Sequence, residues 1–132
     1  MAYWILKTEP STYAFADLVR EKTARWDGVT NPVALRNIRA MKKGDGVMIY
    51  HTGDEKAVVG LAEVASEPYA DPKDARLWVV DLKAGKAVGK PVTLAAVKAD
   101  EAFKDLALVR QGRLSVVSVP DALWARLLKM AG

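Results

Sequence analysis

The chain has 132 residues and a mass of 14.4 kDa, which is the usual size of one domain. Hydrophobic residues make up 51% and charged residues 27%, a composition that predicts a folded core and excludes a disordered chain. The apolar runs are far shorter than the ~20 residues of a membrane span. The first ten residues lack the pattern of a signal peptide. We expect one cytoplasmic domain over residues 1–132, monomeric and without membrane contact.

Cysteine is absent and His51 is the only histidine. These counts exclude disulfides, thiolate metal sites and zinc sites built on two histidines. Phosphate-binding loops, dinucleotide-binding motifs and serine-hydrolase motifs are also missing. We therefore expect no metal, no other cofactor and no enzymatic activity. One alternative stays open, a nucleotide- or RNA-processing enzyme in which His51 or Glu9 acts as acid or base.

The formal net charge of +4 is unevenly distributed along the chain. Residues 28–44 contain four bases and no acid, whereas residues 54–75 contain six acids and two lysines. A basic face is typical of a protein that binds a polyanion, although a solvated helix face has the same composition. The acidic segment, together with the apolar residues of the last helix, keeps a protein–protein adaptor as a further alternative.

The first third of the chain predicts a strand and two helices. Tyr3–Lys7 is an apolar, β-prone run, and Phe15–Glu21 has apolar residues at helical spacing. Asn31 is a good N-cap residue, and Pro32 suits the first position of a helix. This second helix is expected to continue to Gly44, a residue type typical of the position after a helix end.

The rest of the chain alternates between β-prone runs and short helical segments. The expected strands are Val47–His51, Ala57–Ser66, Leu77–Lys83 and Arg113–Val119. Gly60 indicates a bulge or a close backbone approach, and Gly85–Lys90 predicts a turn. Thr93 and Asp100 are expected to cap short helices. A final amphipathic helix opens at Pro120-Asp121 and is expected to face inward with Leu123, Trp124, Leu127 and Leu128. This irregular order favours an α+β fold built on a small, mostly antiparallel β-barrel or a strongly bent sheet.

The four tryptophans are not equivalent. Trp4, Trp78 and Trp124 lie on expected strands or on the apolar stripe of the last helix, which predicts core positions. Trp26 instead precedes a polar turn and a helix N-terminus. An indole at that place is a candidate stacking surface for a planar ligand, and a core role is the alternative.

Four blocks of sequence, taken in order, resemble the EVE domain family. The blocks are Trp4-x-x-Lys7-x-Glu9-Pro10; Trp26-Asp27-Gly28-Val29-x-Asn31 running into Ile38-Arg39-Ala40-Met41-Lys42-Lys43-Gly44-Asp45; Tyr50-His51 followed by Val59-Gly60-Leu61-Ala62-Glu63-Val64; and Arg110-Gln111-Gly112-Arg113-Leu114-Ser115-Val116 with Trp124. The resemblance implies a PUA-like fold, a small β-barrel flanked by short helices. It also implies a reader of modified nucleobases in DNA or RNA, which takes a flipped base into a pocket.

Combined with the residue chemistry, the resemblance implies a division of roles. In the pocket, Trp26 would stack on the base, and Asn31 and Thr52 would hydrogen-bond its edge. The other expected pocket residues are Lys7, Glu9, Tyr50, His51 and Ser115. The residues expected to hold the nucleic-acid backbone are Arg36, Arg39, Lys42, Lys43 and Arg113.

The chain departs from the family pattern at two positions. Many family members carry arginine where this chain has Thr30 and Leu35. The contacts of those arginines therefore do not transfer to this chain, and Arg36, one residue further along, points about 100° away on a helix.

Overall fold

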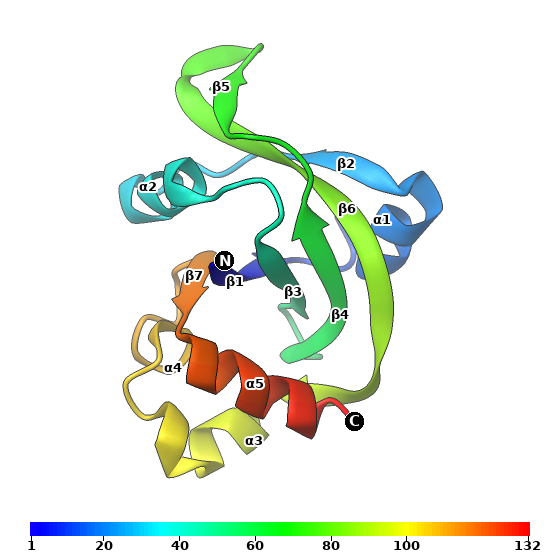
Figure 1. Ribbon diagram of the computed structural model, residues 1–132, viewed down its shortest axis with the longest axis vertical. Helices are drawn as coiled ribbons and strands as arrows, with labels where there is room; N and C mark the ends of the chain where they lie inside the picture. Colours follow the sequence, from blue (N-terminus) through cyan, green and yellow to red (C-terminus); the bar gives the residue numbers. More distant parts are fainter.

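The computed structural model describes residues 1–132 and contains seven strands with short helices between them (Figure 1). The strands are β1 (Tyr3–Thr8), β2 (Thr23–Trp26), β3 (Gly46–His51), β4 (Ala57–Val64), β5 (Tyr69–Asp71), β6 (Asp74–Thr93) and β7 (Val116–Val119). The helices are α1 (Phe15–Glu21), α2 (Pro32–Ala40), α3 (Leu94–Ala99), the 3₁₀ turn η1 (Glu101–Phe103), α4 (Ala107–Arg110) and α5 (Asp121–Met130).

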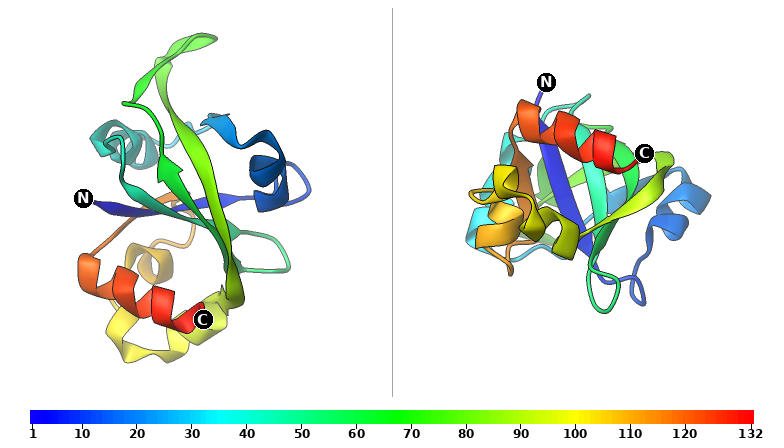
Figure 2. Two further views of the ribbon diagram at one scale, coloured as in Figure 1. Left: turned by 45° about the vertical axis from the view of Figure 1, so that its right-hand side comes forward. Right: turned by 90° about the horizontal axis from the view of Figure 1, so that it is seen from below.

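The strands form one strongly curved sheet in the order β2-β6-β4-β3-β1-β7, and β5 pairs with β6. Only β1 and β3 run parallel, so the α+β class and the mostly antiparallel sheet are confirmed. Strand β6 is 20 residues long and curves from the β5 hairpin down to α3 (Figure 2). The end strands β2 and β7 do not pair with each other. The space between these two strands, which we call the seam, is where the sheet stays open.

One apolar cluster of 31 buried residues runs through the inside of the curved sheet. Nearly every residue of the central strand β3 is buried. Strand β6 instead has buried residues near its middle and long exposed stretches without regular alternation of buried and exposed positions. Helix α2 covers part of the sheet, and the side-chain amide of Asn37 donates a 2.8 Å hydrogen bond to the carbonyl of Val116 in β7. This bond fixes α2 beside the seam.

Several predicted elements are confirmed, and the differences have identifiable causes. Gly85–Lys90 is part of β6 and makes no turn, so that prediction is wrong. A Cβ at Gly85 would lie 2.8 Å from the carbonyl oxygen of Leu61, so the glycine permits a close approach of β6 to β4. Gly60 permits a close approach as well, in this case to the ring of Phe15. The register between β4 and β6 shifts on both sides of Gly60.

Helix α2 begins as predicted, with Asn31 as N-cap and Pro32 in its first turn, but it ends at Ala40, before Gly44. The chain turns extended at Met41, which is fully buried, and the amide of Lys42 donates to the carboxylate of Asp45. The core position of Met41 and this hydrogen bond replace the last predicted turn of helix.

Two apolar side chains are more exposed than predicted. Trp78 is only partly buried, and the guanidinium of Arg39 lies 4.6 Å from its ring centre. In α5, Trp124 and Leu127 face the core as expected, while Leu128 is 38% exposed. No helix is both long enough and apolar enough to cross a membrane.

Candidate functional site

A cavity of about 970 Å³ lies in the seam between β2 and the segment that leads into β7. We call it the seam cavity. Its walls come from β1, the loop after β1, the last residue of α1, β2, the loop between β2 and α2, and the segment before β7. The residues that line it are Lys7, Thr8, Glu9, Thr12, Tyr13, Glu21, Thr23, Ala24, Arg25, Trp26, Asp27, Gly28, Val29, Thr30, Asn31, Arg113 and Ser115. Six of the residues predicted for the site therefore meet at one cavity, namely Lys7, Glu9, Trp26, Asn31, Arg113 and Ser115.

Trp26 is the last residue of β2, where it pairs with Val80 of β6. Its indole is 8% exposed, and the ring of Tyr13 packs edge-on against it at a centroid distance of 6.0 Å. Trp26 is thus part of the core and also part of the cavity wall. Burial of the phenol and its hydrogen bond to Glu21 raise the pKa of Tyr13, so this ring stays neutral.

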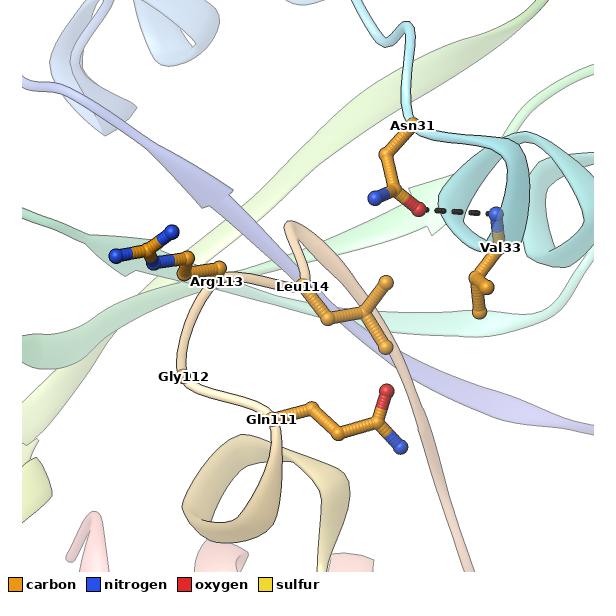
Figure 3. Close-up of a pocket in the computed structure, with 6 residues that line it drawn as sticks. All are labelled: Asn31, Val33, Gln111, Gly112, Arg113 and Leu114. Carbon is orange, nitrogen blue, oxygen red and sulfur yellow. Dashed lines mark hydrogen bonds between the residues drawn. The ribbon is translucent and has the colours of Figure 1, made fainter.

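Asn31 has a structural task in addition to any ligand contact. Its Oδ1 accepts hydrogen bonds from the backbone amides of Val33 (2.9 Å) and Ala34 (3.1 Å), which caps α2. The Nδ2 atom makes no hydrogen bond within the protein and points away from Val33 (Figure 3), so Asn31 brings a free donor to the lining of the seam cavity.

Lys7 and Glu9 place opposite charges on the same wall. The ammonium of Lys7 donates a 2.9 Å hydrogen bond to the carbonyl of Gly112, and burial lowers the pKa of Lys7. One carboxylate oxygen of Glu9, Oε2, accepts from the amide and the hydroxyl of Ser11, which lower the pKa of Glu9. The other oxygen, Oε1, lies against Gly53, where a Cβ would be 2.6 Å away.

Arg25 is a cavity residue that the sequence did not reveal. Its Nε donates to the hydroxyl of Tyr69 at 3.3 Å, and that hydroxyl donates to Asp81 at 2.6 Å. Hydrogen bonding and charge interaction with Tyr69 raise the pKa of Arg25. The sequence signal that could have placed Arg25 on a strand is weak, because β2 has only four residues and so shows little alternation of buried and exposed positions.

Three predicted pocket residues lie outside the seam cavity: Tyr50, His51 and Thr52. Tyr50 is buried, and the ammonium of Lys7 lies 5.7 Å from the centre of its ring. The amide and the hydroxyl of Thr52 both donate to the carbonyl of Thr8. Tyr50 and Thr52 therefore support β1, which carries the cavity residues Lys7 and Thr8.

His51 has both ring nitrogens occupied. Nε2 accepts a 3.0 Å hydrogen bond from the amide of Phe15, so it carries no proton, and Nδ1 lies 2.7 Å from the carboxylate of Glu55. The ring is thus the neutral Nδ1–H tautomer that donates to Glu55. These bonds join the end of β3 to the start of α1 and leave no free nitrogen for acid–base chemistry.

The predicted backbone-binding residues on α2 and just after it also lie outside the cavity. Arg36 and Arg39 are exposed on the helix, and Lys42 and Lys43 are exposed in the turn that follows it. Arg113 alone among the five lines the cavity. No group of three or more histidine or acidic side chains is placed to hold a metal ion.

The sequence profile of the EVE domain matches residues 2–130. The chain belongs to the EVE domain family. The solved structure of Rpa0253 from Rhodopseudomonas palustris is similar to this chain, with 41% sequence identity and a TM-score of 0.95. The match covers the whole of this chain and 94% of Rpa0253. A structure from Agrobacterium tumefaciens gives the same coverage and TM-score at 33% identity.

Two further relatives extend the comparison. Mouse thymocyte nuclear protein 1 is 35% identical over 81 residues, a match that covers 52% of this chain and 36% of the mouse protein. Human THYN1, crystallised in complex with 5-methylcytosine containing DNA, is 22% identical, with a TM-score of 0.91 over 99% of this chain and 98% of that one. At this identity the likeness establishes the shared fold. The chain spans only about a third of the length of the mouse relative.

Proposed function

We propose that this EVE domain is a non-enzymatic binding module that takes a flipped, modified nucleobase of DNA or RNA into the seam cavity. The observation that carries the proposal is the meeting of an indole, a free amide donor, carboxylates and three cations at one cavity, from segments far apart in the sequence. The cavity volume of about 970 Å³ lies within the range of small-molecule sites, ~300–1,000 Å³.

Each group has a task that a flipped base requires. The indole of Trp26 supplies apolar wall for the face of the base, which recovers part of the few kcal/mol spent on unstacking. The Nδ2 of Asn31 donates to an acceptor on the edge of the base. A carboxylate such as Glu9 accepts from an exocyclic amino group, as acids do with cytosine. The guanidinium of Arg113 holds the backbone.

A 5-methylcytosine in DNA is the first ligand to test. The support is the human THYN1 complex with DNA that contains this base, on the same fold. A methyl group buried in the cavity adds about 0.8 kcal/mol of transfer free energy, enough to distinguish modified from unmodified cytosine by several-fold. RNA with the same modified base is the second ligand.

The deciding experiment measures fluorescence anisotropy of labelled oligonucleotides with one 5-methylcytosine or one cytosine, as single strands, duplexes and RNA. The key variant is Asn31→Ser, because serine caps helices as well as asparagine and is neutral but lacks the amide donor. We expect Asn31→Ser to keep the melting temperature of the wild type and to lose about tenfold in affinity for the modified strand. Trp26→Phe should reduce the preference for the modified base while keeping a ring in the core.

Lys98→Ala, at the exposed C-terminal turn of α3, is the matched control and should bind like the wild type. Equal binding of Asn31→Ser and wild type, or no oligonucleotide binding by the wild type, would overturn the proposal. Mass spectrometry of the recovered oligonucleotide completes the experiment. Unchanged ligand supports a binding module, and a cleaved or altered product would favour the enzyme in which Glu9 is the acid or base.

A further inference from the structure

A second cavity, of about 320 Å³, adjoins the seam cavity (Figure 3). We call it the loop cavity. It lies between the start of α2 and the loop that joins α4 to β7, and its lining residues are Asn31, Val33, Gln111, Gly112, Arg113 and Leu114. Asn31 and Arg113 line both cavities, so the two spaces share a boundary.

The lining of the loop cavity combines apolar surface with a free amide. Val33 is 37% exposed, which makes it one of only four large hydrophobic residues exposed on the protein, and Leu114 extends toward it from the opposite side (Figure 3). The side chain of Gln111 points to the same space and makes no hydrogen bond within the protein. A nucleobase has the complementary features, an apolar face and a hydrogen-bonding edge.

Arg113 occupies the boundary between the cavities. Its guanidinium extends away from Val33 and Gln111 (Figure 3), it is exposed, and it forms no ion pair within the protein. Two neighbouring nucleotides of a strand are joined by a single phosphate. If their bases occupy adjoining cavities, that phosphate lies at the boundary, where a guanidinium binds it by charge-assisted hydrogen bonds.

The loop is also held in place from the seam cavity. Lys7 donates to the carbonyl of Gly112, and the amide of Leu114 donates to the carbonyl of Gln111 at 2.9 Å, which closes a turn. The side chains of Gln111 and Arg113 therefore project from a backbone that is fixed before any ligand arrives. Such a fixed backbone lowers the entropic cost of binding.

We propose that the loop cavity binds the nucleobase next to the flipped base, that Arg113 binds the phosphate between the two nucleotides, and that Gln111 discriminates among bases at this flanking position. The inference rests on the proposed function and adds a sequence context to it. The flipped base is chosen by the seam cavity, and its neighbour is chosen by the amide of Gln111.

The test uses single strands with one central 5-methylcytosine and each of the four bases at either flanking position. The wild type should bind the best and worst flanking base at one of these positions with affinities that differ about tenfold. Gln111→Ala should remove this difference and keep the preference for 5-methylcytosine over cytosine. Arg113→Ala should weaken all strands by a similar factor and reduce the salt dependence of binding. Both side chains are exposed, so both variants should fold.

Each outcome decides between the two proposals. A preference for the modified base without any flanking preference overturns the loop-cavity inference and leaves the proposed function standing. A flanking preference that survives Gln111→Ala overturns the role of Gln111 in the same way. Failure of the wild type to bind any of the strands overturns both proposals.

Discussion

The ammonium of Lys7 donates a 2.9 Å hydrogen bond to the carbonyl oxygen of Gly112. Lys7 belongs to β1, inside the sheet, and lines the seam cavity, whereas Gly112 belongs to the loop before β7 and lines the loop cavity. This interaction therefore links the walls of the two cavities, beside the hydrogen bond from the backbone amide of Lys7 to the carbonyl of Ser115. It also places a positive charge, partly removed from water, on the wall of the seam cavity.

The first prediction separates the ligand-binding role of Lys7 from its effect on stability. Burial lowers the pKa of Lys7, so the folded state disfavours the ammonium relative to the unfolded chain. The resulting cost to stability is present at pH values below the lowered pKa and disappears above the ordinary lysine value of about 10.4. At neutral pH, Lys7→Met should thus melt at the wild-type temperature or above it, while oligonucleotide affinity falls roughly tenfold.

Thermal unfolding followed by circular dichroism, together with anisotropy titrations, checks this prediction. Lys86→Met, at an exposed position of β6, is the control for loss of a positive charge and should change neither quantity appreciably. A clear drop in the melting temperature of Lys7→Met would contradict it, because the bond to Gly112 would then outweigh the desolvation cost.

A second prediction concerns Asp45, a buried carboxylate immediately before β3. It accepts hydrogen bonds from the amides of Ala2 (3.1 Å) and Lys42 (3.0 Å) and from the indole of Trp4 (3.0 Å). Asp45→Asn replaces one acceptor oxygen by a donor that faces another donor, which should cost about 1–3 kcal/mol of unfolding free energy. Urea denaturation measures the loss, and the exposed Asp105→Asn is the control.

The same carboxylate makes the stability of the protein depend on pH, and the direction of this dependence follows from the pKa of Asp45. Burial alone would raise the pKa of Asp45, but the hydrogen bonds from Trp4, Lys42 and Ala2 outweigh it, and the pKa lies below its ordinary value. The stabilisation is therefore complete above the unfolded-state value of about 3.9 and is lost as the pH falls through the lowered folded-state pKa. The stability difference between wild type and Asp45→Asn should shrink in acid, and a difference independent of pH would contradict the assignment.

Gly60 supplies a third prediction, about packing. A Cβ at this position would lie 2.3 Å from Cζ of Phe15, whose ring is buried beneath β4. Gly60→Ala should overpack the core and cost about 1–3 kcal/mol. The smaller side chain in the double variant Gly60→Ala/Phe15→Leu should restore part of the loss, measured as a coupling energy in a double-mutant cycle. Gly112→Ala, whose Cβ would have nothing within 4 Å, should be nearly neutral.

Local signals in the sequence were sufficient for much of the fold. The cap formed by Asn31 and Pro32 starts α2 as predicted, because capping depends on neighbouring residues alone. The helix Phe15–Glu21 has the predicted bounds. Strand β2 was missed because only four residues form it and three of them are partly or fully exposed. Its pairing with the distant β6 makes it a strand.

The candidate site was harder to predict, because the seam depends on which strands fail to pair. Trp26 and Ser115 meet at one cavity since β2 and β7 are the two free edges of the sheet. The sequence carries no sign that Tyr50 and His51, which follow each other in β3, are both buried away from the cavity. In the β1–β3 register Lys7 is the partner of Tyr50, and its ammonium lies 5.7 Å from the centre of the Tyr50 ring, so the longer side chain of Lys7 covers the buried ring.

The last prediction concerns Lys42 and Lys43, which are exposed after α2 and lie outside both cavities. If they contact phosphates, they contribute affinity without recognising the base. Replacing both by alanine should weaken binding to every strand and reduce the slope of log affinity against log salt by about 1.4 for single strands, at roughly 0.7 for each phosphate contact. The ratio of affinities for modified and unmodified strands should not change. Titrations at several salt concentrations check this prediction, and the double variant Lys98→Ala/Lys129→Ala is a control with the same change in net charge. A changed ratio of affinities would mean that Lys42 or Lys43 contacts the base, which would contradict the division of roles.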